Sequence, residues 1–110
     1  MKIALVCSDR GPVPPIRGGA IQLLIHKVAP ILAKKHHVTV FSVTDERLDP
    51  VERINGVLFI RYAKEKYLEH ICQYLQAHRF DVIEVFNRPQ FVPLIAAASP
   101  RSKIVLSMHN

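Results

Sequence analysis

The chain has 110 residues, 49% of them hydrophobic, which is enough for one globular domain with its own core and excludes an intrinsically disordered segment. Fifteen lysines and arginines against nine acidic residues give a formal charge of +6, so phosphates, anionic lipids or acidic substrates are the favoured partners. The basic residues are spread along the chain without interleaved aromatic residues, which disfavours a dedicated nucleic-acid surface.

The two cysteines and the first residues of the chain bear on its compartment. Cys7 and Cys72 lie far apart and lack Cys-x-x-Cys spacing, which favours two reduced thiols in the core over a disulfide. The apolar start MKIALVC is shorter than a signal-peptide core, and no run reaches the roughly 18 apolar residues of a membrane span. We therefore expect a cytoplasmic protein, with peripheral contact to a membrane left open.

The first third of the chain predicts a strand, a helix and a second strand. Residues 3–6 are continuously apolar, which is typical of a strand covered on both faces. Apolar side chains recur at steps of three and four over residues 21–32, which predicts an amphipathic helix. Pro30 removes one backbone donor there, so we expect a kink or a tightening. Residues 37–43 alternate and are rich in β-branched side chains, as expected of a strand.

The middle of the chain predicts a hairpin and a second helix. Asn55-Gly56 separates residues 51–54 from residues 57–62, a strong signal for a type I′ turn between a short antiparallel strand and a longer third strand. A second amphipathic pattern begins at Tyr67 and ends near His78, which predicts the second helix.

The last third predicts a strand over residues 81–86, a proline-interrupted helix over 89–99 and a strand over 103–108. Strands that alternate with helices predict an α/β fold with a doubly wound parallel sheet, because each parallel pair needs a crossover helix. Numbering the five parallel strands along the chain, we expect the order 3-2-1-4-5.

The loop after the first strand carries the first candidate site. In a doubly wound sheet, ligands bind at the carboxyl ends of the strands, near the point where the strand order reverses. Gly18 and Gly19 open the first helix there without a Cβ, so backbone N–H groups at the positive end of the helix dipole could meet a diphosphate. Arg17 would add charge, although a solvated arginine and a tight turn explain these residues equally well.

Two further loops reach the same edge of the predicted sheet. Asn87 and Arg88 follow the fourth strand, and His109 follows the fifth. His109 could equally be a cap or a satisfied, half-buried side chain. Glu84 lies among apolar neighbours, where a functional acid and an acid paired with a base are both open interpretations.

Three stretches of the chain resemble retaining glycosyltransferases of family 4, which have the GT-B fold. The opening of that family is similar to MKIALVCSDRGPVPPIRGGAIQLLIHKVAPILAKKHHVTVFSV, and its fourth and fifth strands are similar to DVIEVFNRPQFV and KIVLSMHN. The similarity covers essentially the whole chain and is greatest to bacterial spore-coat or cell-surface glycosyltransferases.

The resemblance implies that residues 1–110 are a single Rossmann-like domain, the N-terminal and acceptor-side part of a two-domain enzyme. It implies roles for five residues: contact with the donor diphosphate for Gly18 and Gly19, contact with the transferred hexose or the leaving phosphate for His109, and the acceptor side for Asn87 and Arg88. Arg17 stays a candidate for the diphosphate because of its charge beside the glycines. The implied partners are a nucleotide-sugar donor and a glycan or glycolipid acceptor of the cell envelope or spore coat.

The resemblance also implies what these residues lack. The family's donor-binding C-terminal domain, with its basic residues and paired-glutamate motif, lies outside this sequence, so we expect the 110 residues alone to be inactive. No metal or other cofactor is implied, and the chain has no Asp-x-Asp motif. An unfinished sheet would leave an open edge strand, through which the chain could pair with another copy.

Two other interpretations compete with a transferase. A doubly wound domain could serve as a non-catalytic structural or binding module of a coat or surface assembly. A flavodoxin-like or response-regulator-like domain would need a phosphate-binding Ser/Thr-rich loop or an acidic cluster after the first strand, where only Asp9 is of that kind.

Overall fold

A computed structural model describes residues 1–16 and 18–109 of the chain. The strands are β1 (Lys2–Val6), β2 (His37–Val43), β3 (Val51–Ile54), β4 (Val57–Tyr62), β5 (Val82–Phe86) and β6 (Lys103–Ser107). The helices are α1 (Ala20–Leu32), α2 (Tyr67–Ala77) and α3 (Val92–Ala98), the last preceded by the 3₁₀ turn η1 (Pro89–Phe91).

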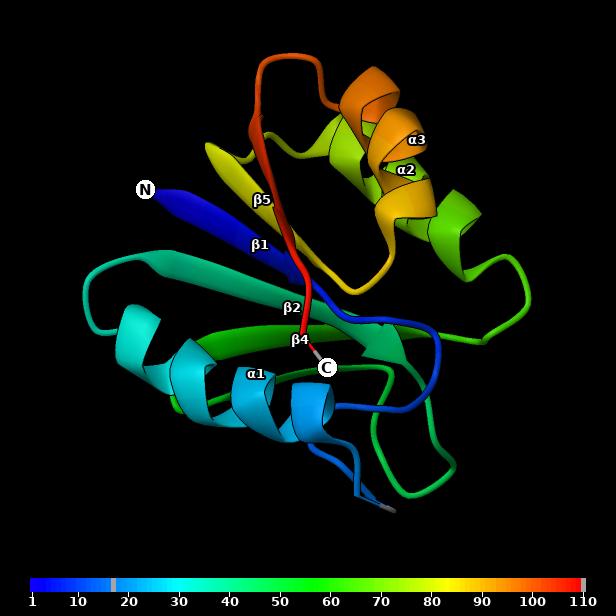
Figure 1. The fold of residues 1–110 in the computed structure, drawn as a ribbon. Helices are drawn as coiled ribbons and strands as arrows, with labels where there is room; N and C mark the ends of the chain where they lie inside the picture. The colour runs from blue at the N-terminus through cyan, green and yellow to red at the C-terminus, as the bar shows by residue number, and fades with distance from the viewer. Residues whose placement is uncertain (17, 110) are drawn as a thin grey trace.

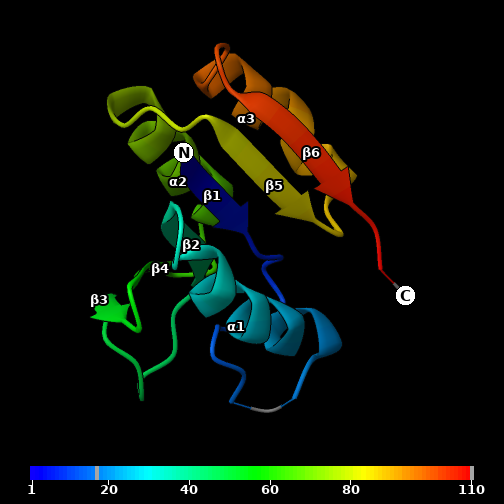
Figure 2. The ribbon, with the colours of Figure 1, turned by 90° about the vertical axis from the view of Figure 1, so that its left-hand side faces the viewer.

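The strands form one sheet that is covered by helices on both faces (Figure 1). All neighbouring strands are parallel except β3 and β4. Ile25 of α1 packs in a core on one face of the sheet, whereas Ile71 of α2 and Ile95 of α3 share the core on the other face. Figure 2 shows α1 separated from α2 and α3 in this way. The α/β, doubly wound, Rossmann-like arrangement is therefore confirmed.

The sheet differs from the predicted order because it has a sixth strand. Its order is β3-β4-β2-β1-β5-β6, so five parallel strands lie side by side and the antiparallel β3 extends the β4 edge. Asn55 and Gly56, with φ of 52° and 80°, turn the chain from β3 into β4. Both positive φ values are what a type I′ turn requires, so the hairpin prediction is confirmed. The order 3-2-1-4-5 left this edge strand out.

The proline-interrupted helix predicted over residues 89–99 is confirmed, and the interruption divides it into η1 and α3. The N–H of Phe91 donates to the carbonyl of Arg88 at 3.0 Å, which closes a 3₁₀ turn, and α3 begins one residue later. Pro93 has no N–H to donate to the carbonyl of Pro89, so a continuous α-helix would lack a bond at that position. α1 keeps Pro30 inside it and ends at Leu32.

Both cysteines are free, as predicted, with Cys7 buried and Cys72 half-buried. Burial raises the pKa of the Cys7 thiol to about 12 and also raises the pKa of Cys72. Among the described residues, no helix is both long enough and apolar enough to cross a membrane.

Candidate functional site

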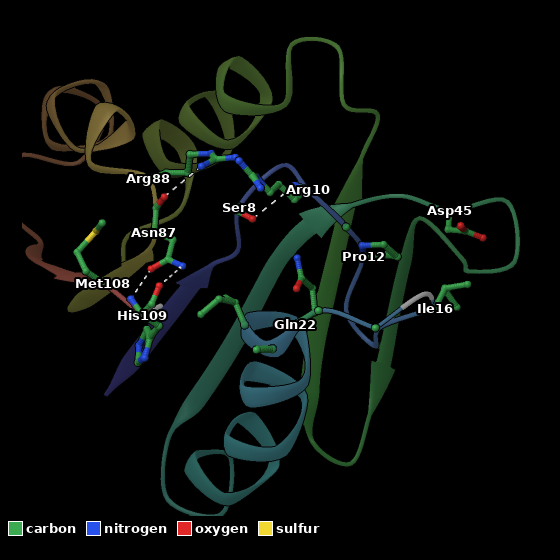
Figure 3. A pocket seen from close by; sticks show the side chains of 15 residues that line it. Ser8, Arg10, Pro12, Ile16, Gln22, Asp45, Asn87, Arg88, Met108 and His109 are labelled. Atoms are coloured by element: carbon green, nitrogen blue, oxygen red, sulfur yellow. Dashed lines mark hydrogen bonds between the residues drawn. The ribbon is translucent and has the colours of Figure 1, made fainter.

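A cavity of about 650 Å³ opens at the carboxyl ends of β1, β5 and β6, beside the first turn of α1 (Figure 3). Three loops that are remote in sequence meet there, as predicted from the topology. The lining residues include Ser8, Arg10, Gly18, Gly19, Gln22, Asp45, Asn87, Arg88 and His109. We call residues 8–22 the glycine side of this pocket, and residues 87–88 with 108–109 its histidine side.

Gly18 and Gly19 give the glycine side an open stretch of backbone. Their φ values are 80° and 114°, a region that favours glycine. Gly19 is the N-cap of α1, no side chain caps it, and the first turn has no acidic residue. The N–H of Leu23 donates to the Gly19 carbonyl at 3.0 Å, so the amides of residues 20–22 precede the first bond of the helix. This terminus can therefore donate hydrogen bonds to an anion.

The two glycines are required for different reasons. A Cβ on Gly19 would lie 2.2 Å from Oε1 of Gln22, whereas a Cβ on Gly18 would meet no atom within 4 Å. Gln22 is 6% exposed, and its Nε2 lies 3.5 Å from where a Cβ on Gly11 would be. Gln22 thus packs between two parts of the loop. The sequence reasoning missed it, because a glutamine on an amphipathic helix predicts a solvated side chain.

The loop before the glycines is fastened to the sheet at Val13, which is fully buried. Its N–H donates to Oγ of Ser42 on β2 at 3.2 Å. Its carbonyl accepts from Nε and Nη2 of Arg61 on β4, at 3.1 and 2.9 Å. The loop that carries Gly18 and Gly19 is therefore held by side chains of the neighbouring strands.

Arg61 is itself completely enclosed, with 0% side-chain exposure. Nη1 donates to the carbonyl of Asp49 and to Oε1 of Glu52, both at 2.7 Å. Its guanidinium also lies 5.0 Å from the centre of the Phe59 ring. A buried charge needs such a complete set of partners. Sequence reasoning missed Arg61, because arginine side chains are mostly exposed and nothing in the run VLFIRY indicates a buried one.

On the histidine side, Asn87 contacts the chain at His109. The Asn87 Oδ1 accepts from the His109 N–H at 2.6 Å, and Nδ2 donates to the His109 carbonyl at 2.9 Å. The imidazole of His109 stacks on Phe86 with ring centres 5.9 Å apart and an interplanar angle of 19°. His109 is therefore neither a helix cap nor half-buried; it is exposed at the rim of the pocket.

Arg88 is paired rather than free. Its Nε and Nη2 donate to Oδ1 of Asp9, at 3.0 and 2.9 Å, and Nη1 donates to the Asn87 carbonyl at 3.2 Å. Asp9 belongs to the loop after β1, so this ion pair joins the two sides of the pocket. Asp9 also lines a second cavity of about 390 Å³, next to Lys64 and Tyr67.

Arg10 lines the pocket and has no carboxylate partner among the described residues. Asp45 pairs with Arg47, at 3.0 Å between Oδ1 and Nε. The pocket can therefore attract an anion. Arg17, which we expected at this position, lies outside the described residues.

Glu84 lies outside the pocket lining and accepts a hydrogen bond from the Ser107 hydroxyl. Its partner is therefore a hydroxyl on the neighbouring strand and not a base. No group of three or more histidine, cysteine, aspartate or glutamate side chains that could hold a metal occurs within the described part of the chain.

Comparison with known proteins finds two relatives in Bacillus subtilis (strain 168). The chain is 44% identical over 110 residues to "Spore coat protein SA" and 46% identical over 110 residues to "Putative glycosyltransferase YtcC". Both alignments include the whole chain but only 29% and 27% of the relatives, so the chain spans less than a third of their length. No family model matches the chain. No solved structure matches it.

Proposed function

We propose that this chain is the acceptor-side, N-terminal part of a retaining glycosyltransferase of family 4 with the GT-B fold. The whole protein would transfer a hexose from a nucleotide-sugar to a glycan or glycolipid acceptor of the cell envelope or spore coat. The observation that carries the proposal is that Gly18, Gly19 and His109 line one pocket at the carboxyl edge of the sheet. The 46% identity to a protein named as a glycosyltransferase supports the same reaction class.

In this proposal the glycine side receives the donor diphosphate. The amides at the start of α1 and the exposed Gly18 backbone supply hydrogen bonds, and Arg10 and Arg17 supply positive charge. Departure of the nucleoside diphosphate develops negative charge on its phosphate oxygens, so fixed donors at that point lower the barrier. The acceptor hydroxyl would attack from the same face, which retains the configuration of the sugar. No step of this transfer calls for a metal.

The histidine side would hold the hexose. His109 stands at the pocket rim, where its imidazole could donate a hydrogen bond to a sugar hydroxyl or to the leaving phosphate. Asn87 and Arg88, also on the histidine side, would lie next to the acceptor. In the structure, the Asn87 side chain is hydrogen-bonded to His109 and the Arg88 side chain to Asp9. The donor-binding domain and its paired glutamates would lie in residues beyond these 110, so the chain alone would not turn over.

The test is sugar transfer and donor hydrolysis by the whole protein against a panel of UDP-, GDP- and ADP-sugars. We expect His109→Ala and Gly18→Ala to lower turnover strongly. Gly56→Ala is the matched glycine control, because Gly56 has the same φ of 80° as Gly18 but lies in the β3–β4 hairpin. His26→Ala, on the exposed face of α1, is the matched histidine control. A folded protein that neither binds nor cleaves any member of the panel would refute the proposal.

The 44% identity to a protein named as a spore coat protein favours a second candidate, a non-catalytic module of a coat or surface assembly. The two candidates also differ in place: a transferase would act in the cytoplasm or at the membrane surface, a module within the coat. Within the part of the chain that the structure describes, β6 pairs with β5 alone, so its other edge could pair with a second copy. An inert protein that assembles through this edge would favour the module.

A further inference from the structure

Asn87 has an unusual backbone for a residue at a strand end. Its φ is 56°, in the left-handed region, which asparagine tolerates better than most residues. Its N–H still donates to the Ser107 carbonyl at 2.9 Å, beside the last paired residues of β5 and β6. The backbone therefore turns away from the sheet at Asn87. The Asn87 side chain stays next to His109, in the segment after β6.

The side chain of Asn87 then continues the pairing that the backbone ends. Its amide exchanges two hydrogen bonds with one residue, His109, as two opposed residues of an antiparallel pair do, although β5 and β6 themselves are parallel. The orientation of the amide is fixed, because the His109 N–H is only a donor and must face Oδ1. The exit of β6 is thus held to the exit of β5 as far as His109 (Figure 3).

The Phe86 ring adds a second contact. It is 6% exposed and stacks on the imidazole of His109, so it restricts the plane of that ring. One contact therefore places the His109 backbone and the other orients its side chain, both from adjacent residues at the end of β5. His109 itself is exposed, and it follows β6, which within the described residues pairs with β5 alone.

We propose that Asn87 is a positioning residue, which acts on the reaction by holding His109 in the pocket and not by binding the acceptor. This inference rests on the proposed function, in which His109 touches the transferred sugar or the leaving phosphate. Both polar atoms of the Asn87 side chain already have a partner in His109. Each of these two atoms can form one further hydrogen bond, so the KM measurement below separates a ligand contact from the positioning role.

Three variants separate these roles. Asn87→Gly keeps the left-handed backbone and removes both side-chain bonds. Asn87→Asp keeps the acceptor for the His109 N–H but replaces the donor with an oxygen that faces the His109 carbonyl. Asn55→Gly is the matched control, because Asn55 is also at positive φ, 52°, but lies in the β3–β4 turn.

The first measurement is amide hydrogen exchange and ring-proton chemical shifts of His109 by NMR in the 110-residue chain. We expect Asn87→Gly to speed exchange at His109 by about tenfold and to weaken the ring-current shift from Phe86, with Asn87→Asp in between. Asn55→Gly should leave His109 unchanged. Unchanged exchange at His109 in Asn87→Gly would overturn the proposal.

The second measurement is steady-state transfer by the whole protein. We expect Asn87→Gly to lower kcat about 10- to 100-fold with little change in the KM of donor or acceptor. Combining it with His109→Ala should add little further loss, because residues that act as a unit are not additive. A raised acceptor KM with unchanged kcat would show an acceptor ligand and overturn the proposal. An inactive wild type would refute the proposed function, while the exchange data would still decide whether Asn87 holds His109.

Discussion

The two sides of the pocket are held in place by different means. The glycine side is fastened by buried groups, above all Arg61, whose side chain is 0% exposed and which holds the Val13 carbonyl. The histidine side is fastened near the surface, by the Asn87 amide and by stacking on Phe86. The backbone of the glycine side, where we propose that the diphosphate binds, is thus held by buried groups, whereas His109 is held at the exposed rim of the pocket.

The largest loss of stability should come from replacing the buried Arg61, which holds the loop of the glycine side. Replacing Arg61 with methionine leaves two backbone carbonyls and the Glu52 carboxylate without their donor. We expect the free energy of unfolding to fall by about 3 to 5 kcal/mol, measured by urea denaturation of the chain. Arg53→Met, on the exposed side of the same hairpin, is the control and should cost little. Equal losses from the two variants would contradict the role given to Arg61.

Alanine substitutions at Gly18 and Gly19 should separate the cost of backbone strain at positive φ from the cost of a steric clash. Gly18→Ala has positive φ but open space, so we expect a loss of about 1 kcal/mol in the free energy of unfolding. Gly19→Ala adds a clash with Gln22, and its loss should be larger by about 1 to 3 kcal/mol. Adding Gln22→Ala to Gly19→Ala should recover part of that difference. If the two glycine variants lose the same amount, Gln22 does not pack as described.

The pH dependence of stability should reflect the burial of Cys7, which follows β1 and precedes the glycine side. Burial raises the pKa of the Cys7 thiol from 9.0 to about 12, so above pH 9 the unfolded chain loses a proton that the folded chain keeps. Stability should therefore fall as pH rises from 9 towards 12, by roughly 1 kcal/mol over the first unit. Cys7→Ala should lose less over the same interval, in urea titrations at pH 8, 9 and 10. Parallel curves for the two proteins would contradict the burial of Cys7.

The smallest change in stability should come from the ion pair that joins the two sides. Asp9→Asn should cost at most about 1 kcal/mol, because both side chains are partly exposed, at 33% for Asp9 and 19% for Arg88. It frees the Arg88 charge, so calorimetry should show tighter binding of pyrophosphate, most clearly at low salt. Glu65→Gln changes the net charge equally on an exposed residue away from the pocket. Unchanged or weaker binding in Asp9→Asn would show that Arg88 does not face the anion.

Much of the fold could be predicted because its signals are local. The apolar run of β1, the helical period of α1 and the turn at Asn55-Gly56 each depend on neighbours in the sequence. The interruption of the helix over residues 89–99 was predicted from its prolines, but the sequence did not show that the first turn is a 3₁₀ turn.

The contacts that hold the pocket could not be predicted in the same way. Arg61 and Val13 are 48 residues apart, and Arg88 and Asp9 are 79 apart, so no pattern along the chain joins them. The topology placed three loops at one edge, which predicted where Gly18, Asn87 and His109 meet. It could not show that Asn87 faces His109, since that depends on the left-handed turn at the end of β5.

The most direct test of the central claim is a crystal structure of the whole protein with a nucleotide-sugar that supports turnover. The account predicts that the diphosphate lies against the Gly18 backbone and the amides of residues 20–22 and that the sugar lies within hydrogen-bond distance of His109. A donor bound with its diphosphate away from the start of α1, or with its sugar away from His109, would contradict it.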